Sequence, residues 1–555
     1  MTRIDDIYRR IADRPEVFLA IRPQADVEAD HRRSLAAGGP LAGVLLAVKD
    51  NVDVAGLPTT AACPGYAYSP DADADSVAAL RAAGAVVIGK TNLDQFATGL
   101  VGTRSPHGAV RDSRRPDRIS GGSSSGSAVA VALGFADIAI GTDTAGSGRV
   151  PAALQGLVGV KPTVGVISTG GVVPACASYD VVTIFAADLA LANRATAAMK
   201  AAVGPRPFPS SIPYAAPERP TVAVPAELPG LDERWRAAFD DAICRAEAAG
   251  FVVKTIDLAP FLEAARLLYD DALVAERADA VGEYLASVTD PIADGVDPTV
   301  AGIIGAAGRF SAVDLLRARR RLTVLRDEAM GQWGDATALL VPTAPMHPTI
   351  AEVAADPVGV NSTMGTYTNF CNLFDLSALA VPAGTVAEAD GTESRFGVTF
   401  LGRGHDDAVL VDVAGRFLGS PVAGPSWVEP DDAIELAVFG AHMRGGPLTQ
   451  ELSDRGARWA GEVTTTAAYR LVALDTTPPK PGLIRDPAAG RAIRGEIWTL
   501  PSAALGEFLA ALPQPMMLGR VEIAAGETGP ARWVVGFGCA ADAGAEGESL
   551  DRDRW

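Results

Sequence analysis

Two clusters of glycine and serine, separated by an apolar stretch, mark residues 120–162, which read SGGSSSGSAVAVALGFADIAIGTDTAGSGRVPAALQGLVGVKP. The apolar runs between the clusters predict a helix that begins near Ser124, followed by a strand. Glycine permits tight turns and lets another molecule approach the main chain closely. The segment therefore predicts two turns that present hydroxyl and backbone N–H groups beside a helix N-terminus, where negative charge is stabilised.

From Leu41 onward, apolar strands alternate with alanine-rich helices. Residues 44–48 predict a strand, residues 76–83 a helix and residues 85–88 a further strand. The 555 residues, 48% of them hydrophobic, supply enough apolar surface for a large core. We therefore predict an α/β fold with a mixed or largely parallel central sheet covered by helices.

Breaks in this pattern predict the domain organisation. Ile4, Ile7 and Ile11 share one helical stripe, so residues 3–35 predict two amphipathic helices ahead of the main fold. The proline-rich stretch at 204–220 predicts a surface excursion within the main domain. The predicted parts are an N-terminal helical extension (1–40), the main domain (41–420), a linker (421–432), a small α+β domain (433–542) and a flexible tail (543–555).

The charge and the cysteines limit the partners and the compartment. A formal net charge of −19 argues against nucleic acid or an anionic membrane as a partner, and an anionic substrate must meet a locally basic pocket. The five cysteines show neither CxxC pairing nor the spacing of a disulfide framework, which favours a reducing compartment. The sequence has no run of 18 apolar residues and no apolar core of a signal peptide near its start, so we expect a cytoplasmic protein.

A serine nucleophile needs a base, and the usual histidine is missing from both clusters. Lys49 instead ends the apolar segment LAGVLLAVK, where partial burial would lower its pKa and give a neutral amine. Each residue also has a structural explanation: Ser123, with Ser124, could cap the following helix, Ser147 could be a turn residue, and Lys49 could be a solvated lysine at a strand end.

Taken together, the segments GGSSSGSAVAVA, GTDTAGSGRVPAALQGLVGVKPT and AVKDNVDVAGLPTTAAC resemble the diagnostic segments of the amidase-signature family. The resemblance extends from Leu41 to about Gly415. It implies the amidase-signature fold and a triad of Lys49 as base, Ser123 in a cis peptide as proton relay, and Ser147 as nucleophile. It implies no metal ion and no cofactor.

In the implied mechanism, neutral Lys49 accepts a proton from Ser123 while Ser123 accepts one from Ser147, whose oxygen attacks the amide carbonyl. Water then hydrolyses the acyl-enzyme. We expect Asp143 and Arg149 to support the catalytic loop. The expected oxyanion hole consists of backbone N–H groups in the TAGS turn, namely those of Thr144, Ala145, Gly146 and Ser147.

The segment RLLYDDALVAER predicts one helix on which Tyr269 and Arg277, eight residues apart, share a face. An arginine in such a pocket suits bidentate binding of a substrate carboxylate. This segment, with TYTNFCNLFDLSALAVPAG and ASYDVVTIFA, resembles the allophanate hydrolases, in which it holds the substrate carboxylate. It differs from them at residues 270–272, Asp-Asp-Ala here, where a Gly-Pro-Trp-like stretch is expected. The expected substrate-binding residues are Gly122, Tyr269 and Arg277.

The C-terminal segments VFGAHMRGGPL, TPPKPGLIR and IRGEIWTLP resemble a domain that is appended to many allophanate hydrolases. They also resemble the γ-glutamyl cyclotransferase fold, in which the turn GAHMRGGPL could bind a carboxylate through backbone N–H groups. Pro513 and Gln514 stand where those enzymes need an acid, so we expect no cyclotransferase activity. His442 is a candidate site residue that could assist decarboxylation of the first product, or it is a packed histidine at a strand end.

The resemblance implies a hydrolase that cleaves allophanate, the carboxylated urea, to ammonia and N-carboxycarbamate, which loses carbon dioxide. It implies a role in urea degradation and coupling to a biotin-dependent urea carboxylase. The predicted N-terminal helices favour a homodimer. Two alternatives are an amidase that acts on another small amide, and a binding or scaffolding protein without turnover. The presence of Lys49, Ser123 and Ser147 argues against the second alternative.

Overall fold

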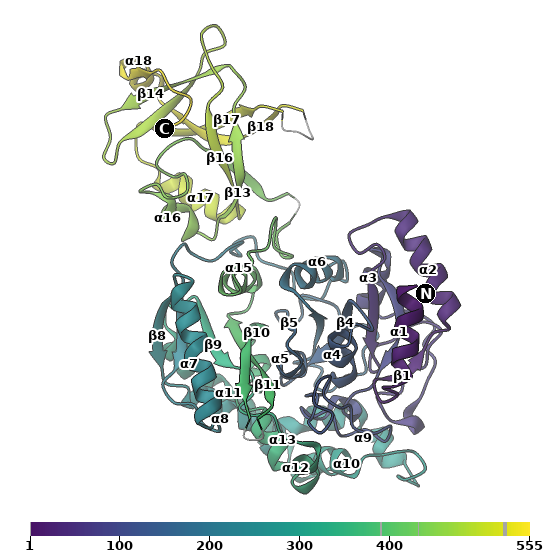
Figure 1. Ribbon diagram of the computed structural model, residues 1–555. Helices are drawn as coiled ribbons and strands as arrows, with labels where there is room; N and C mark the ends of the chain where they lie inside the picture. The colour runs from purple at the N-terminus through teal and green to yellow at the C-terminus, as the bar shows by residue number, and fades with distance from the viewer. Residues whose placement is uncertain (1, 389–390, 431, 526–529) are drawn as a thin grey trace. The chain divides into compact units, whose positions relative to one another are not determined.

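A computed structural model of the chain describes residues 2–388, 391–430, 432–525 and 530–555. The chain divides into two compact units (Figure 1). The main unit consists of Met1–Pro207 and Thr221–Pro421, and the C-terminal unit consists of Phe208–Pro220 and Val422–Trp555.

Within the described residues, the main unit has one sheet of eleven strands. The pairs β2–β3, β2–β4, β7–β8 and β7–β9 are parallel and the other pairs are antiparallel, so the sheet is mixed. In sheet order the strands are β1 (Phe18–Ile21), β3 (Val86–Thr91), β2 (Leu45–Lys49), β4 (Ile138–Asp143), β6 (Val181–Ala186), β5 (Val158–Lys161), β10 (Ser377–Ala387), β11 (Glu393–Gly402), β9 (Ala338–Pro342), β7 (Thr221–Pro225) and β8 (Val252–Ile256).

Helices cover this sheet (Figure 1). Every residue of β2, β3, β4, β5 and β6 is buried, which explains why these strands are mostly apolar and do not alternate between polar and apolar residues. The helices are α1 (Arg3–Ile11), α2 (Gln24–Ala37), α3 (Asp75–Ala82), α4 (Ser125–Ala132), α5 (Val150–Gln155), α6 (Leu189–Met199), α7 (Glu233–Ala248), α8 (Ala259–Asp270), α9 (Ala275–Ser287), α10 (Pro298–Gly305), α11 (Ala312–Trp333), α12 (Ile350–Ala355), α13 (Gly359–Met364), α14 (Phe370–Leu373) and α15 (Asp407–Phe417).

The N-terminal segment differs from the expected extension. α1 and α2 form, but β1 lies between them and pairs with β3 as the edge strand of the sheet. The stripe of Ile4, Ile7 and Ile11 is buried in the core of the main unit. The first 40 residues therefore belong to the main unit, because β1 and the apolar face of α1 are buried against it.

The proline-rich stretch is the second difference. Residues 208–220 belong to the C-terminal unit and not to the main unit. The backbone N–H of Tyr214 donates to the carbonyl oxygen of Gly456 at 2.8 Å, and the ring of Phe208 lies 5.6 Å from that of Trp427. These contacts link residues that are distant in the sequence, which local composition does not reveal.

The C-terminal unit has a five-stranded sheet in the order β13-β16-β12-β18-β17 and a three-stranded sheet in the order β15-β14-β19, as far as it is described. The expected flexible tail is ordered in part: α18 begins at Ala541 and β19 pairs with β14, so that its backbone gains hydrogen-bond partners. The elements are β12 (Ile434–Val438), α16 (Thr449–Ser453), β13 (Arg458–Thr464), β14 (Tyr469–Leu474), β15 (Lys480–Arg485), β16 (Arg494–Leu500), α17 (Ser502–Ala511), β17 (Met516–Ile523), β18 (Arg532–Cys539), α18 (Ala541–Glu546) and β19 (Glu548–Leu550).

No single helix among the described residues is long and apolar enough to cross a membrane. One pair of helical segments, Pro298–Arg309 and Ala312–Trp333, meets the length and composition criteria together, but it is bent by 100°.

Candidate active site

The structure brings Lys49 and Ser123 together. Lys49 is the last residue of β2, and its Nζ lies 2.7 Å from Ser123 Oγ and 2.7 Å from Thr142 Oγ1. Thr142 lies near the end of β4, which runs parallel to β2, so both strands deliver polar side chains to the same edge of the sheet. Ser123 precedes α4, whose N-cap is Ser124.

Lys49 is completely buried, and this burial lowers the pKa of its amine to about 7. The carboxylates of Asp94, Asp180 and Asp143 oppose the shift, whereas the guanidinium of Arg277 reinforces it. A lysine with this pKa is largely neutral slightly above pH 7, so it can accept a proton.

Gly122 occupies a position that has no room for a side chain. A Cβ atom there would lie 2.0 Å from Asp94 Oδ2 and 2.6 Å from the backbone nitrogen of Gly102. The peptide bond between Gly122 and Ser123 is cis. The Gly122 N–H donates to the carbonyl oxygen of Leu100 at 2.9 Å, so this N–H is not available to a substrate.

Ser147 lies on a turn that a buried ion pair holds in shape. Arg149 donates to both oxygens of Asp143 at 2.9 Å, and both side chains are fully buried. Burial acts to raise the pKa of Asp143, but Arg149 holds it below its usual value. The same carboxylate accepts the backbone N–H groups of Gly146 and Gly148, each at 3.0 Å. Ser147 itself is 3% exposed.

These contacts correct one expected member of the oxyanion hole. The N–H of Gly146 points to Asp143 and therefore cannot donate to a substrate oxygen at the same time. The backbone N–H groups of Thr144, Ala145 and Ser147 remain as candidates.

Arg277 and Tyr269 meet, although they do not lie on one helix. α8 ends at Asp270, the extended backbone of Asp271 interrupts the helix, and α9 begins at Ala275. Across this break a guanidinium nitrogen of Arg277 donates to the Tyr269 hydroxyl at 2.9 Å, and the guanidinium carbon lies 5.0 Å from the ring centroid. The predicted single helix is therefore wrong, while the predicted proximity of the two side chains is observed.

Arg277 is a buried cation with unused hydrogen-bonding capacity. It is 1% exposed, and its Nε has no hydrogen-bond partner within the described part of the chain. Among the carboxylates whose side chains the structure describes, none forms an ion pair with it; a second nitrogen donates to Thr98 Oγ1 at 2.9 Å. Burying such a charge is unfavourable unless a partner compensates it, so this arrangement is suited to an anionic ligand.

Four polar residues of the site were missed by the sequence analysis. The amide of Asn372 donates to the carbonyl oxygens of Asp143 at 2.8 Å and Tyr179 at 2.9 Å, and the Thr144 hydroxyl donates to the Asp180 carboxylate. Each of the four missed residues has other polar residues close by in the sequence, so no local pattern sets it apart. The four residues are Asp94, Thr142, Asp180 and Asn372.

His442 lies in the C-terminal unit and is 5% exposed. Its Nε2 lies 2.9 Å from Glu451 Oε2, and its ring stacks on Phe537 with centroids 5.0 Å apart. Burial lowers the pKa of His442 although Glu451 opposes the shift. His442 and the mostly buried Lys480 both line a small cavity of about 20 Å³. His442 is thus a packed histidine that borders a cavity with room for about one water molecule.

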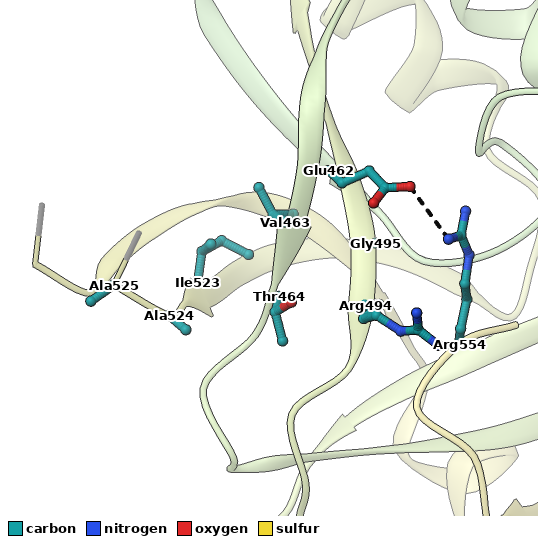
Figure 2. Close-up of a pocket in the computed structure, with 9 residues that line it drawn as sticks. All are labelled: Glu462, Val463, Thr464, Arg494, Gly495, Ile523, Ala524, Ala525 and Arg554. Carbon is teal, nitrogen blue, oxygen red and sulfur yellow. Dashed lines mark hydrogen bonds and ion pairs between the residues drawn. The ribbon is translucent and has the colours of Figure 1, made fainter. Parts of the chain in front are cut away.

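A second cavity of the C-terminal unit, with a volume of about 280 Å³, is shown in Figure 2. Its two arginines are already paired with carboxylates, Arg494 with Asp553 at 3.0 Å and Arg554 with Glu462 at 3.4 Å. The cavity therefore offers no unpaired cation to a ligand. It is lined by Glu462, Val463, Thr464, Arg494, Gly495, Ile523, Ala524, Ala525 and Arg554.

Known proteins match both parts of the chain. Residues 16–423 match the amidase family, and residues 434–551 match the allophanate hydrolase C-terminal domain. The urea amidolyases of Lachancea kluyveri and Saccharomyces cerevisiae are 44% and 42% identical to this chain over 90% of its length, and the chain spans 28% of the length of each.

Among solved structures, Kluyveromyces lactis allophanate hydrolase superimposes with a TM-score of 0.85 at 37% identity, which covers 99% of this chain and 95% of that one. This similarity extends over the main unit and the C-terminal unit. The chain therefore belongs to the amidase-signature family and carries the C-terminal domain of the allophanate hydrolases.

Proposed function

We propose that this protein hydrolyses allophanate to ammonia and N-carboxycarbamate, which then loses carbon dioxide, as a step of urea degradation. Arg277 is the observation that carries this proposal, because it is a buried guanidinium whose Nε has no hydrogen-bond partner among the described side chains and its charge influences the pKa of Lys49. A small amide that bears a carboxylate fits both the Arg277 guanidinium and the Lys49 amine. The similarity to Kluyveromyces lactis allophanate hydrolase supports the same substrate.

In the proposed reaction, neutral Lys49 accepts the proton of Ser123, which accepts the proton of Ser147 as Ser147 Oγ attacks the amide carbonyl. The oxyanion is stabilised by backbone N–H groups of the turn at residues 144–147, with Gly146 excluded. The relay then protonates the departing ammonia, and water attacks the acyl-enzyme. Burial of Lys49 supports its role, because the amine is neutral near pH 7 only when it is removed from water.

Arg277, with Tyr269 beside it, binds the substrate carboxylate in this proposal, and Gly122 lines the site without using its N–H. Replacing Arg277 by glutamine is expected to raise KM for allophanate about 100-fold, because a bidentate, charge-assisted interaction is lost. The effect on kcat should be smaller. Steady-state ammonia release measures both parameters, and an unchanged KM would contradict the assignment.

A substrate panel distinguishes this function from a general amidase. Allophanate and biuret have the same skeleton, but biuret has a neutral amide in place of the carboxylate. We expect ammonia release without ATP and a clear preference for allophanate, which the Arg277→Gln variant loses. A preference for biuret or for apolar amides would favour an amidase that acts on another small amide.

His442 is proposed to assist decarboxylation of the first product, because its imidazole lies beside the mostly buried amine of Lys480 on a small cavity and could exchange a proton there. The His442→Ala variant is expected to let ¹³C-labelled N-carboxycarbamate persist longer than with the wild-type protein. Carbon NMR during turnover follows both species. An unchanged lifetime of the intermediate would leave His442 with a packing role only.

Allophanate is a carboxylated urea, so the reaction that supplies it must carboxylate urea. We propose that this chain works with a biotin-dependent urea carboxylase, and the name of the two longer urea amidolyases is consistent with such coupling. We further propose a homodimer and a cytoplasmic location, the latter because all five cysteines are free. Sedimentation equilibrium and cell fractionation test these two statements.

A further inference from the structure

The loop at residues 94–104 contacts the catalytic serine of the relay. The backbone N–H of Asp94 donates to the carbonyl oxygen of Ser123 at 3.1 Å. The carbonyl oxygen of Leu100 accepts the N–H of Gly122 at 2.9 Å. The loop therefore binds the backbone of both residues that flank the Gly122–Ser123 peptide.

The same loop contacts the cation that is proposed to bind the substrate. A guanidinium nitrogen of Arg277 donates to Thr98 Oγ1 at 2.9 Å and to the carbonyl oxygen of Ala97 at 3.4 Å. Thr98 is fully buried, so water cannot replace its hydroxyl as an acceptor. Removing this oxygen would free the guanidinium to turn away from its present position.

The carboxylate of Asp94 holds the loop together. Asp94 Oδ2 accepts the backbone N–H groups of Val101 at 3.2 Å and Gly102 at 3.0 Å, and Oδ1 accepts that of Arg104 at 2.9 Å. The Arg104 guanidinium closes the loop by donating to the carbonyl oxygen of Thr98 at 2.8 Å. Asp94 is completely buried, and these bonds connect the Ser123 end of the loop with its Arg277 end.

We propose that loop 94–104 is a positioning element that fixes the carboxylate-binding arginine relative to the proton relay. In this arrangement Thr98 orients the guanidinium of Arg277, and Asp94 maintains the loop and the position of Ser123. Neither side chain has to touch the reacting atoms. The inference rests on the proposed function, since it assumes that Arg277 binds a substrate carboxylate. A displacement of the Arg277 guanidinium relative to Ser123 by about 1 Å is enough to lower the rate about 100-fold.

The first test replaces Thr98 by valine, which has the same shape but no acceptor. We expect KM for allophanate to rise about 10- to 100-fold with a smaller change in kcat, because the buried guanidinium loses a partner. Thr98→Ser keeps the hydroxyl and should restore a KM near that of the wild type. Thr196→Val is the matched control, since Thr196 is a fully buried threonine of α6 whose hydroxyl donates to the carbonyl oxygen of Ala192 in the same helix at 2.8 Å.

The second test replaces Asp94 by asparagine. One of the two terminal atoms of the asparagine side chain is then an NH₂ group, which cannot accept a backbone N–H, so the three hydrogen bonds of Asp94 cannot all be kept. We expect kcat for allophanate to fall about 100-fold. The rate at which a neutral sulfonyl fluoride labels Ser147, measured by peptide mass, should fall as well, because the relay itself is displaced. Thr98→Val should change this labelling rate much less than KM, because the probe has no carboxylate.

An unchanged KM in Thr98→Val, or no rescue by Thr98→Ser, would overturn the role of Thr98. Wild-type labelling in a folded Asp94→Asn variant would overturn the role of Asp94. If Asp94→Asn does not fold, Asn361→Ala decides, because Asn361 accepts the Leu100 N–H at 2.7 Å from outside the loop and its loss should also slow labelling. If the wild-type protein is labelled at Ser147 but does not hydrolyse allophanate, the proposed function and the role of Thr98 are both overturned. The role of Asp94 is still tested in that case, because the labelling rates of the wild-type protein and the Asp94→Asn variant can be compared without allophanate.

Discussion

Replacing Ser147 by alanine is expected to lower kcat for allophanate about 10⁴-fold or more, because no other residue is proposed to supply the attacking oxygen. The side chain is small and lies on a turn held by Asp143 and Arg149, so folding should be preserved. Ammonia release under single-turnover conditions measures the loss, and the melting temperature checks the fold.

Ser34→Ala provides the control for this variant, since Ser34 lies on α2 and contacts Gly43 and Gly84 instead of the catalytic turn. It should leave kcat close to that of the wild type. Residual activity of the Ser147→Ala variant within about tenfold of the wild type would show that the nucleophile has been misassigned.

Replacing Lys49 by arginine is expected to lower kcat about 10²- to 10⁴-fold, which is the usual contribution of a general base. A guanidinium remains protonated at any accessible pH, so it keeps the positive charge but cannot accept the Ser123 proton. The variant therefore separates the charge of Lys49 from its basicity. Measurement of kcat, with circular dichroism as a folding check, tests the assignment.

The pH profile of the wild-type protein tests the same residue without a substitution. The pKa of Lys49 is lowered to about 7 by burial, so the amine is neutral above this pH and charged below it. kcat/KM should therefore reach a plateau above about pH 7 and fall about tenfold per pH unit below it. A profile that stays flat through this range would contradict a lysine base.

Patterns that act locally allowed much of the fold to be predicted from the sequence. The alternation of apolar strands with alanine-rich helices predicted the α/β class, and the comparisons confirm an amidase-signature fold. The helix near Ser124 follows from its apolar run, whereas Ser124 stands at the N-cap without a side-chain capping hydrogen bond and contacts the backbone of Thr142 instead. The predicted meeting of Lys49 with Ser123 is observed, but it came from family resemblance, since 74 residues separate the two in the chain.

Long-range pairings account for what the sequence analysis missed. Strand β1 is only four residues long and becomes recognisable through its pairing with β3. The assignment of Gly146 to the oxyanion hole was wrong because the direction of its N–H depends on Asp143, which the sequence pattern does not specify. The carboxylate of Asp94 contacts backbone N–H groups of a loop. Such contacts leave no periodic pattern in the sequence, so the role of Asp94 could not be predicted from it.

The interruption between α8 and α9 affects how the substrate range of this fold can change. The proposed carboxylate-binding arginine lies just after a helix break at residues 271–274, whereas Lys49 and Thr142 lie on buried strands of the sheet. A change in the length or composition of that short connection can move α9 while the strands keep their hydrogen bonds. If the proposed roles hold, the substrate preference can change through the connection between α8 and α9, provided that Arg277 keeps its contact with Thr98 on the loop that also holds Ser123.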